Sequence, residues 1–274
     1  MRLVPPLAAG ECQVWWADAS ASHGLLAAAG GENAGAAATA AVGLLDARER
    51  THWQRLRNPA GRALYLTAHV LARLVLGAQL RLPPAELAFD AECARCGGPH
   101  GKPRLAERAG RAGRAGPEST AGWEFSLSHT PHRVAVAMAR RTPLGVDVER
   151  VRDRAAATVA RTLSEREYAT LNARPAHCRA GDFARYWARK EAALKATGDG
   201  LAVRPDLLTV SGPDAPAALL GWSGPQAPHS TVHLVDLAPG TGYRACLGVL
   251  AEADATPRVT EHDAGALLRA SLPA

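Results

Sequence analysis

Hydrophobic residues recur at helical spacing in two long segments of the chain. In the first segment, Leu66, Val70 and Leu74 lie four residues apart and form one stripe for burial. Asn58 is a favourable N-cap for this helix, and Gly77 is the residue type that most often follows a helix end. We therefore expect a buried helix that begins after Asn58 and ends at Gly77.

The second helical segment lies in the C-terminal half. We expect it to span residues 182–198, with Phe183, Trp187 and Leu194 on its apolar face. A capping-box sequence that begins at Ser164 predicts a shorter helix just before it.

Short apolar runs, some of them alternating with polar residues, predict strands in both halves of the chain. These runs are Val14–Trp16, Phe125–Ser128, Val134–Met138, Leu144–Val148, Val232–Val235 and Tyr243–Leu250. The segment 20–43, rich in Ala, Gly and Ser, predicts a loop or a weak helix, and the segments 106–122 and 213–230 are typical of long connections. Together, the helices and strands predict an α+β protein.

The distribution of strands suggests two domains. A strand-poor first half gives way near Arg140–Pro143 to a second cluster of strands and helices. We therefore place the boundary there and expect an N-terminal subdomain at 1–142 and a C-terminal subdomain at 143–274.

Composition and charge exclude several classes of protein. The chain has 274 residues, of which 47% are hydrophobic and 21% charged, as in globular proteins, and no run of eighteen apolar residues would span a membrane. The opening residues are too weakly apolar for a signal peptide, and five cysteines are few. We therefore expect a cytoplasmic protein without a disulfide framework. A formal net charge of +6 favours an anionic partner.

Lysine is rare, and its positions are informative. Of the 32 basic residues, 3 are lysines, at positions 102, 190 and 195, so 32 − 3 = 29 are arginines. The compact ammonium group of lysine differs physically from the planar guanidinium group. A point charge is therefore expected to matter at these three positions.

Two carboxylates in one predicted strand could hold a metal ion. If Val146 and Val148 face the core, then Asp147 and Glu149 share the opposite face. Carboxylate oxygens are preferred ligands of Mg²⁺. The alternative interpretation is an exposed polar face with Arg150 as an ion-pair partner.

Other polar residues are candidates for the same chemistry. Glu191 and Lys195 lie one helical turn apart, either as a surface ion pair or as a metal ligand beside a phosphate-binding amine. His129 follows Ser128 near a strand end, where it is either a packed neutral histidine or a phosphate ligand.

A short loop motif and a cysteine pair precede these residues. In Gly101-Lys102-Pro103, the glycine permits close backbone approach, the proline stiffens the turn and the lysine offers a charge. Just upstream, Cys93, Cys96 and His100 could begin a zinc site, but no second C-x-x-C is present, so thiols in a loop are the alternative.

In this order and at this spacing, the motifs resemble the Sfp-type 4′-phosphopantetheinyl transferases. The family pattern G-[IV]-D-[IV]-E is matched at 145–149, and W-x-x-K-E-[AS]-x-x-K-x-x-G-x-G at 187–200. The pattern F-x-x-S-H-[ST] is matched at 125–130 and G-K-P at 101–103. The resemblance covers roughly residues 55–250.

The resemblance implies a fold of two similar α+β subdomains related by pseudo-twofold symmetry, with the site between them. It implies coenzyme A as the donor, Mg²⁺ as the cofactor and a serine of an apo acyl or peptidyl carrier protein as the acceptor, with 3′,5′-ADP released. Fatty-acid, polyketide and peptide-synthetase carriers all stay open. The positive charge would steer an acidic carrier toward apolar residues between Leu163 and Leu171.

The resemblance also implies roles for individual residues. Asp147, Glu149 and Glu191 would hold Mg²⁺, and Glu191, Lys195 and His129 would be catalytic. Glu191 is the candidate base, with a metal-bound water as its rival. The residues expected to contact coenzyme A are Arg57, Arg62, Arg73, Gly101, Lys102, Pro103, Ser128, His129 and Lys195, of which Arg57 and Arg62 are placed by charge and periodicity alone.

Two other classes use similar residues. A Mg²⁺-dependent phosphodiesterase or nuclease also clusters carboxylates, but it would normally use aromatic stacking, and aromatic residues are only 5% here. A non-enzymatic nucleic-acid-binding module would show salt-sensitive DNA binding that does not depend on Asp147. We expect instead a monomeric transferase that binds neither nucleic acid nor membrane.

Overall fold

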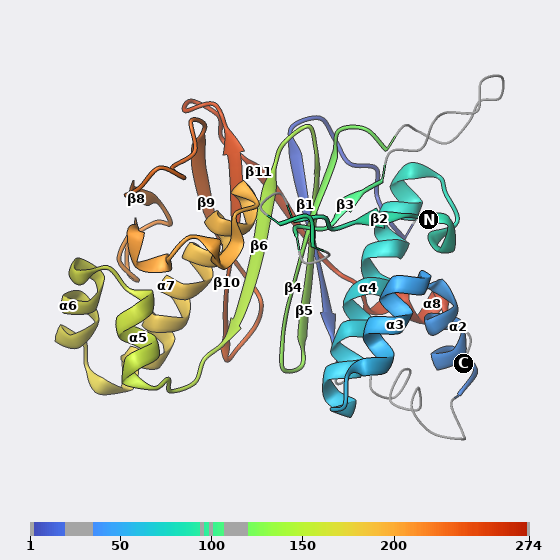
Figure 1. The fold of residues 1–274 in the computed structure, drawn as a ribbon, viewed down its shortest axis with the longest axis horizontal. Coiled ribbons are helices and arrows are strands. Elements are labelled where there is room, and N and C mark those ends of the chain that lie inside the picture. The colour runs from blue at the N-terminus through green and yellow to red at the C-terminus, as the bar shows by residue number, and fades with distance from the viewer. Residues whose placement is uncertain (1–2, 20–34, 94–95, 99–100, 107–119, 273–274) are drawn as a thin grey trace.

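The architecture is a stack of four layers in the order helix, sheet, sheet, helix (Figure 1). A computed structural model describes residues 3–19, 35–93, 96–98, 101–106 and 120–272 of the chain. The two sheets pack face to face, and one long helix covers the outer face of each.

The first sheet has four strands in the order β11-β1-β5-β4. Its strands are β1 (Glu11–Asp18), β4 (Trp123–Thr130), β5 (Arg133–Arg140) and β11 (Arg258–Asp263). Strand β11 runs parallel to β1, and the other pairs are antiparallel. On the outer face, Trp15, Phe125 and Met138 pack against helix α4 (Pro59–Leu80).

Helix α4 is the central helix of the first half. It is long and apolar enough to cross a membrane by composition, yet 72% of its most apolar window is buried inside the fold, as in a core helix. Around it lie α2 (Ala36–Leu44), α3 (Ala47–Arg55), α8 (Gly265–Ser271), η1 (Pro84–Glu86), β2 (Phe89–Asp90) and β3 (Arg104–Leu105).

The second sheet has three antiparallel strands in the order β6-β10-β9. They are β6 (Leu144–Arg150), β9 (Thr231–Leu237) and β10 (Tyr243–Ala251), and α7 (Ala176–Thr197) covers their outer face. The remaining elements are α5 (Ala156–Thr162), α6 (Glu165–Ala173), η2 (Gly200–Ala202), η3 (Pro205–Leu207), β7 (Leu208–Val210) and β8 (Leu219–Trp222).

The two halves repeat one connectivity. Each half has three antiparallel strands whose first, third and second members in chain order lie side by side, as β1-β5-β4 and β6-β10-β9. In each half, a 22-residue helix connects the first of these strands to the second. This repetition confirms the expected α+β fold of two similar halves.

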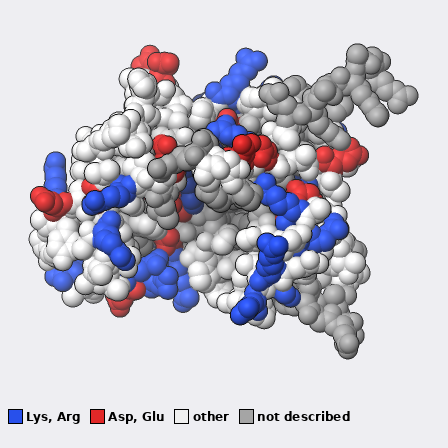
Figure 2. Space-filling model, viewed as in Figure 1, with Lys and Arg blue, Asp and Glu red and all other residues white. Residues whose placement is uncertain are grey.

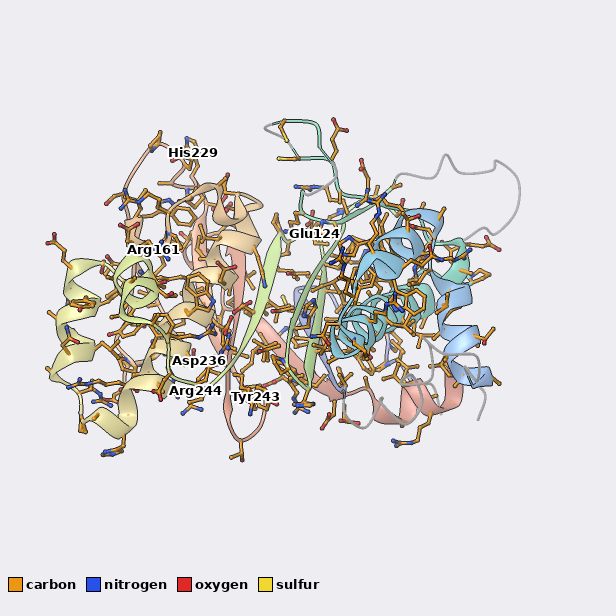
Figure 3. All side chains as sticks on the ribbon, turned by 60° about the horizontal axis from the view of Figure 1, so that its bottom comes forward. Glu124, Arg161, His229, Asp236, Tyr243 and Arg244 are labelled. Atoms are coloured by element: carbon orange, nitrogen blue, oxygen red, sulfur yellow. The ribbon has the colours of Figure 1, made fainter. Side chains whose placement is uncertain are left out.

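The halves are joined by a shared core and by the C-terminal segment. Val14 and Ala137 of the first sheet pack against Val146 and Leu247 of the second. At one end of this joint, the Tyr243 hydroxyl donates to a carbonyl of the β4–β5 turn, 3.0 Å away (Figure 3). Strand β11 and helix α8 join the first sheet and α4, although they come from the C-terminal end of the chain. The boundary at 142/143, between β5 and β6, stays a prediction.

The first helix does not end at Gly77 as expected, but continues to Leu80 and ends with Arg81 in the left-handed conformation, at φ 54°. A Cβ on Gly77 would lie 2.8 Å from the carbonyl oxygen of Leu82. The glycine is therefore required for the chain to fold back onto the helix rather than for the helix end.

Helix α7 begins at Ala176, earlier than expected, and ends before Gly198, whose φ of 87° is that of a C-terminal cap. The expected strands are all present. Helix α2 lies at the end of segment 20–43, for which a weak helix is one of the two expectations, and the expected connection 213–230 contains strand β8. Residues 20–34 and 107–119, within the segments 20–43 and 106–122, lie outside the described residues.

A buried ion pair ties α6 to α7. The Lys190 ammonium lies 2.5 Å from Glu167 and donates to three carbonyl oxygens, those of Thr162, Pro205 and Leu208. Glu167 also accepts from the backbone N–H of Ser164, which confirms the expected capping box. Four oxygens that converge on one point suit a compact ammonium better than a planar guanidinium.

Candidate active site

The candidate site lies where the free edge of β6 meets β4. Strand β6 pairs with β10 on one side only, so every second backbone N–H and C=O on the other side needs a partner. Side chains supply these partners. The Val146 and Val148 N–H groups donate to Ser126 and Ser128, 3.1 and 3.2 Å away, and Lys195 donates to the Val146 carbonyl at 3.1 Å.

Close packing of α7 on β6 brings the acidic residues together. Asp147 and Glu149 project from β6 toward α7, and Glu191 comes from α7 itself. A Cβ on Gly145 would lie 2.6 Å from the carbonyl carbon of Lys195, and one on Gly248 would lie 2.6 Å from the carbonyl oxygen of Ala192. Only glycine permits this approach of helix to sheet.

The oxygens of Asp147 and Glu191 are unequally used. Asp147 Oδ1 accepts from Ser128 at 2.9 Å and from Lys195 at 2.6 Å, whereas Asp147 Oδ2 is buried and has no hydrogen-bond partner. Glu191 Oε1 is likewise buried and without a partner. Two buried carboxylate oxygens are therefore unsatisfied, an arrangement that is costly unless a cation or a proton occupies the site.

Both oxygens of Glu149 are engaged. The Trp187 indole N–H donates to Oε1 at 2.8 Å, and Arg154 donates to Oε2 at 2.6 Å. The sequence predicts only a core position for Trp187, so its bond to Glu149 is an addition from the structure. The signal is present in the sequence, because Trp187, Glu191 and Lys195 are four residues apart and lie on one helical stripe.

Burial and mutual repulsion dominate the electrostatics of the site. Burial, together with the charge of Asp147, raises the pKa of Glu149 and that of Glu191 to about 7. Although His129 is exposed, desolvation by the surrounding protein atoms lowers its pKa, and the nearby Lys195 and His69 lower it further. His129 is thus neutral at physiological pH and can donate one N–H.

This arrangement fits a divalent cation through two of its three expected ligands. No group of three or more His, Cys, Asp or Glu side chains stands in metal-binding positions in the part of the chain that the structure describes. Both oxygens of Glu149 are hydrogen-bonded, to Trp187 and Arg154. The three expected metal ligands are therefore not arranged around one metal position in this structure. The unpartnered oxygens of Asp147 and Glu191, however, are hard ligands in a buried acidic setting, as Mg²⁺ requires.

A cavity of about 600 Å³ lies on the α4 side of β4. Phe125 and Leu127 of β4 contribute to its wall, as do Gly101 and Pro103, two of the residues expected to contact coenzyme A. His129 does not line this cavity, but it lies close enough to His69 in the cavity wall and to Lys195 for both charges to lower its pKa.

The opposite wall of the cavity is aromatic and basic. The Tyr65 ring stacks between His69, at 3.9 Å between centroids, and His52, at 4.9 Å. Arg48 and Arg55 of α3 line the same wall, and both are exposed. Figure 2 shows basic side chains on the surface of the α3 lobe. Neither arginine is predicted from the sequence, because the basic stripe of the next helix is the more regular pattern.

Arg73 and Arg62 both hydrogen-bond to other parts of the protein. Arg73 is fully buried. Its guanidinium donates to the carboxylates of Glu49 and Asp46 and to the carbonyl oxygens of Pro84 and Leu87. No N–H of Arg73 is therefore available for a phosphate. Arg62 donates to the carbonyl oxygens of Gln54 and Leu56, which closes the end of α3. The structure therefore argues against Arg73 as a ligand of the 3′-phosphate, whereas the expectation for Arg62 stays a prediction. Arg57 is exposed and is not among the residues that line the cavity.

Lys102 also differs from expectation. It donates to the Leu144 carbonyl at 2.8 Å and lies 3.7 Å from Glu124, which is labelled in Figure 3. Burial lowers the pKa of its ammonium to about 8. Lys102 thus closes the β6 edge instead of facing the cavity, while its neighbours Gly101 and Pro103 line the cavity.

The possible zinc site is only partly described. Cys93 begins a tight turn in which its carbonyl accepts from the N–H of Gly97, at 2.8 Å, and its own N–H donates to Gly98. His100 lies outside the described residues, so zinc binding by Cys93, Cys96 and His100 stays an open prediction.

Comparison with known proteins identifies the class to which this site belongs. The model of the 4′-phosphopantetheinyl transferase superfamily matches residues 143–247, which include β6 and α7. The 4′-phosphopantetheinyl transferase HetI of Nostoc sp. is 30% identical over 177 residues, which cover 64% of this chain and 68% of HetI. The 4′-phosphopantetheinyl transferase ffp of Bacillus subtilis is 25% identical over 169 residues, which cover 62% and 67% of the two chains. The holo-[acyl-carrier-protein] synthase structure from Thermotoga maritima shares 22% identity over 40% of this chain and 63% of its own, with a TM-score of 0.35.

The chain belongs to the 4′-phosphopantetheinyl transferase family. It is therefore an enzyme that transfers phosphopantetheine to carrier proteins, and coenzyme A is the family's donor. The comparisons give no support to the nuclease and nucleic-acid-binding alternatives.

Proposed function

We propose that transfer depends on Mg²⁺ held by Asp147 and Glu191, with Glu149 beside them. The observation that carries this proposal is the pair of buried, unpartnered oxygens, Asp147 Oδ2 and Glu191 Oε1. A bound Mg²⁺ would neutralise charge on the diphosphate of coenzyme A.

The side chains around the carboxylates would handle the phosphate oxygens and the proton. The carrier serine oxygen forms a bond to the β-phosphorus of coenzyme A, and the bond from that phosphorus to the oxygen of 3′,5′-ADP breaks. Glu191 is the candidate to accept the serine proton, with water as the rival base, because the pKa of about 7 is that of the metal-free carboxyl and a bound cation would lower it. Lys195 and the neutral His129 donate hydrogen bonds to phosphate oxygens as negative charge develops on the leaving group.

The cavity beside β4 would take the nucleotide end of coenzyme A. Its aromatic wall of His52, Tyr65 and His69 offers a face for adenine, and Arg48 and Arg55 offer charge for the 3′-phosphate. His129, which is near both His69 of the cavity wall and Lys195, would hydrogen-bond to the diphosphate between cavity and carboxylates.

The direct test combines the enzyme with coenzyme A, Mg²⁺ and an apo acyl or peptidyl carrier protein. We expect mass spectrometry of the carrier to show the addition of one phosphopantetheine group. Chelation with EDTA, or Asp147→Ala, is expected to abolish the addition while circular dichroism shows an intact fold. Modification that persists in EDTA, or at a normal rate in Asp147→Ala, would remove the metal and its ligand from the mechanism.

Arg48 provides a test of the nucleotide site. We expect Arg48→Ala to raise the KM for coenzyme A about tenfold and to leave the KM for dephospho-coenzyme A unchanged, because only the former carries the 3′-phosphate. Arg50→Ala, which removes an exposed arginine of the same helix that does not line the cavity, is the matched control and is expected to change neither KM. Equal effects of Arg48→Ala on both donors would contradict this placement.

Three further features stay predictions from the sequence. The carrier is expected to be acidic, and its pathway is open, since the net charge of +6 is the only guide to the partner. Action as a monomer in the cytoplasm is testable by light scattering and by localisation of a tagged protein.

A further inference from the structure

The Ser128 hydroxyl has no hydrogen-bonding capacity to spare. It donates to Asp147 Oδ1 at 2.9 Å and accepts from the Val148 N–H and from the Lys195 ammonium, both at 3.2 Å. A hydroxyl has one proton and two lone pairs, so these three bonds use all of it. Ser128 is also buried, with 6% of its surface exposed. The expectation that Ser128 contacts coenzyme A stays a prediction, and in this structure its hydroxyl is fully engaged within the protein.

The bonds that Ser128 and Lys195 donate to Asp147 determine which of its oxygens is free. Ser128 and Lys195 both approach Oδ1, which leaves Oδ2 as the unpartnered atom. The ammonium of Lys195 is in turn held near the carboxylate by the same hydroxyl. Ser128 thus contacts both the anion and the cation of the site, although it faces neither the cavity nor solvent.

Ser126 provides an internal comparison. It lies two residues earlier on the same face of β4, is equally buried and accepts from the Val146 N–H at 3.1 Å. Among the hydrogen bonds of the described residues, none joins Ser126 to a carboxylate or an ammonium. The two serines therefore share the task of covering the β6 edge, and Ser128 alone touches charged groups.

We propose that Ser128 is a positioning residue of the carboxylate centre, whose hydroxyl fixes the Asp147 carboxylate and the Lys195 ammonium relative to each other. Groups that orient metal ligands commonly change metal affinity or activity by about 10- to 100-fold when removed. The inference rests on the proposed function, because the centre it supports is the proposed Mg²⁺ site.

The test compares Ser128→Ala with Ser126→Ala and Ser128→Thr. Mn²⁺ alone is titrated into each protein without coenzyme A and followed by electron paramagnetic resonance, and kcat and KM are measured separately. We expect Ser128→Ala to weaken Mn²⁺ binding about tenfold or more and to lower kcat with little change in the KM for coenzyme A. Ser128→Thr keeps the hydroxyl and is expected to restore part of both losses.

Ser126→Ala is expected to leave Mn²⁺ affinity unchanged, although both alanine variants unfold at lower urea concentration because each leaves one N–H of β6 unpaired. Equal Mn²⁺ binding by the two alanine variants would overturn the inference, since both serines would then be structural only. A raised KM with unchanged Mn²⁺ binding in Ser128→Ala would also overturn it, because Ser128 would then be a substrate contact. Wild-type protein that binds no Mn²⁺ would instead overturn the proposed metal centre and the inference that rests on it.

Discussion

Glu191→Gln is expected to abolish transfer and at the same time to stabilise the metal-free protein at pH 8. Loss of a general base and metal ligand should lower kcat by about 10³-fold or more. The stability gain arises because Glu191 is buried beside Asp147 and Glu149, which raises its pKa from 4.5 to about 7. The carboxyl group of Glu191 is therefore needed for activity but lowers the stability of the metal-free protein at pH 8.

The sign of the pH dependence follows from the raised pKa. A carboxyl whose folded pKa lies above its unfolded value contributes stability that is fully present below about pH 4.5 and is lost as the pH rises through 7. At pH 8 the folded protein bears the cost of the charged form, up to about 3 kcal/mol for such a shift. The neutral amide avoids this cost.

Urea unfolding in EDTA at pH 5 and pH 8 measures the effect. We expect Glu191→Gln to exceed the wild type in free energy of unfolding at pH 8 and to lose most of that advantage at pH 5. Glu252→Gln, which removes the same charge from an exposed position, is the control and should show no such difference. An advantage of Glu191→Gln that is the same at both pH values would contradict the assignment to the buried carboxyl.

Gly145→Ala is expected to move helix α7 away from strand β6 and so to separate the charged residues that these two elements carry. The added methyl group would meet backbone atoms of Ala192, Lys195 and Ala196, none of which can rotate away. Helix α7 must therefore move off β6, and we expect a loss of about 1–3 kcal/mol in the free energy of unfolding. Because Glu191 and Lys195 move with the helix, a displacement near 1 Å should lower kcat about 10²-fold.

Gly221→Ala is the matched control, because Gly221 also lies in a strand but has nothing within 4 Å of its Cβ position. It is expected to be neutral in both stability and activity. The measurements are urea unfolding and carrier modification rates. A Gly145→Ala enzyme with wild-type activity would show that the close contact of α7 with β6 is not needed for catalysis.

The three lysines show what residue identity alone can and cannot indicate. The sequence indicates that a compact charge matters at three positions, and each of the three ammonium groups donates to backbone carbonyl oxygens. Whether such a group faces substrate is decided by the tertiary structure. Lys195 lies among the acidic residues, Lys190 is enclosed by α6 and η3, and Lys102 closes the β6 edge.

The sequence by itself determined where the helices and strands lie and which side chains the motifs bring to the candidate site. Alternation along β6 and the four-residue spacing on α7 are local properties, so the faces that carry Asp147, Glu149, Glu191 and Lys195 follow from the order of residues alone. The long helices could be predicted for the same reason, although their ends shifted by several residues.

Only the tertiary structure decided which charged groups are paired within the protein and which remain available to a ligand. Arg73 follows the periodicity of a ligand-binding face, but its partners Glu49 and Asp46 come from a separate helix and its cap, and no local pattern indicates that pairing. The cavity arginines, the bond from Trp187 to Glu149 and the saturated hydroxyl of Ser128 likewise depend on contacts between distant segments. Local spacing determines the direction in which a side chain points, whereas its partners depend on how α7, β6 and β4 pack together.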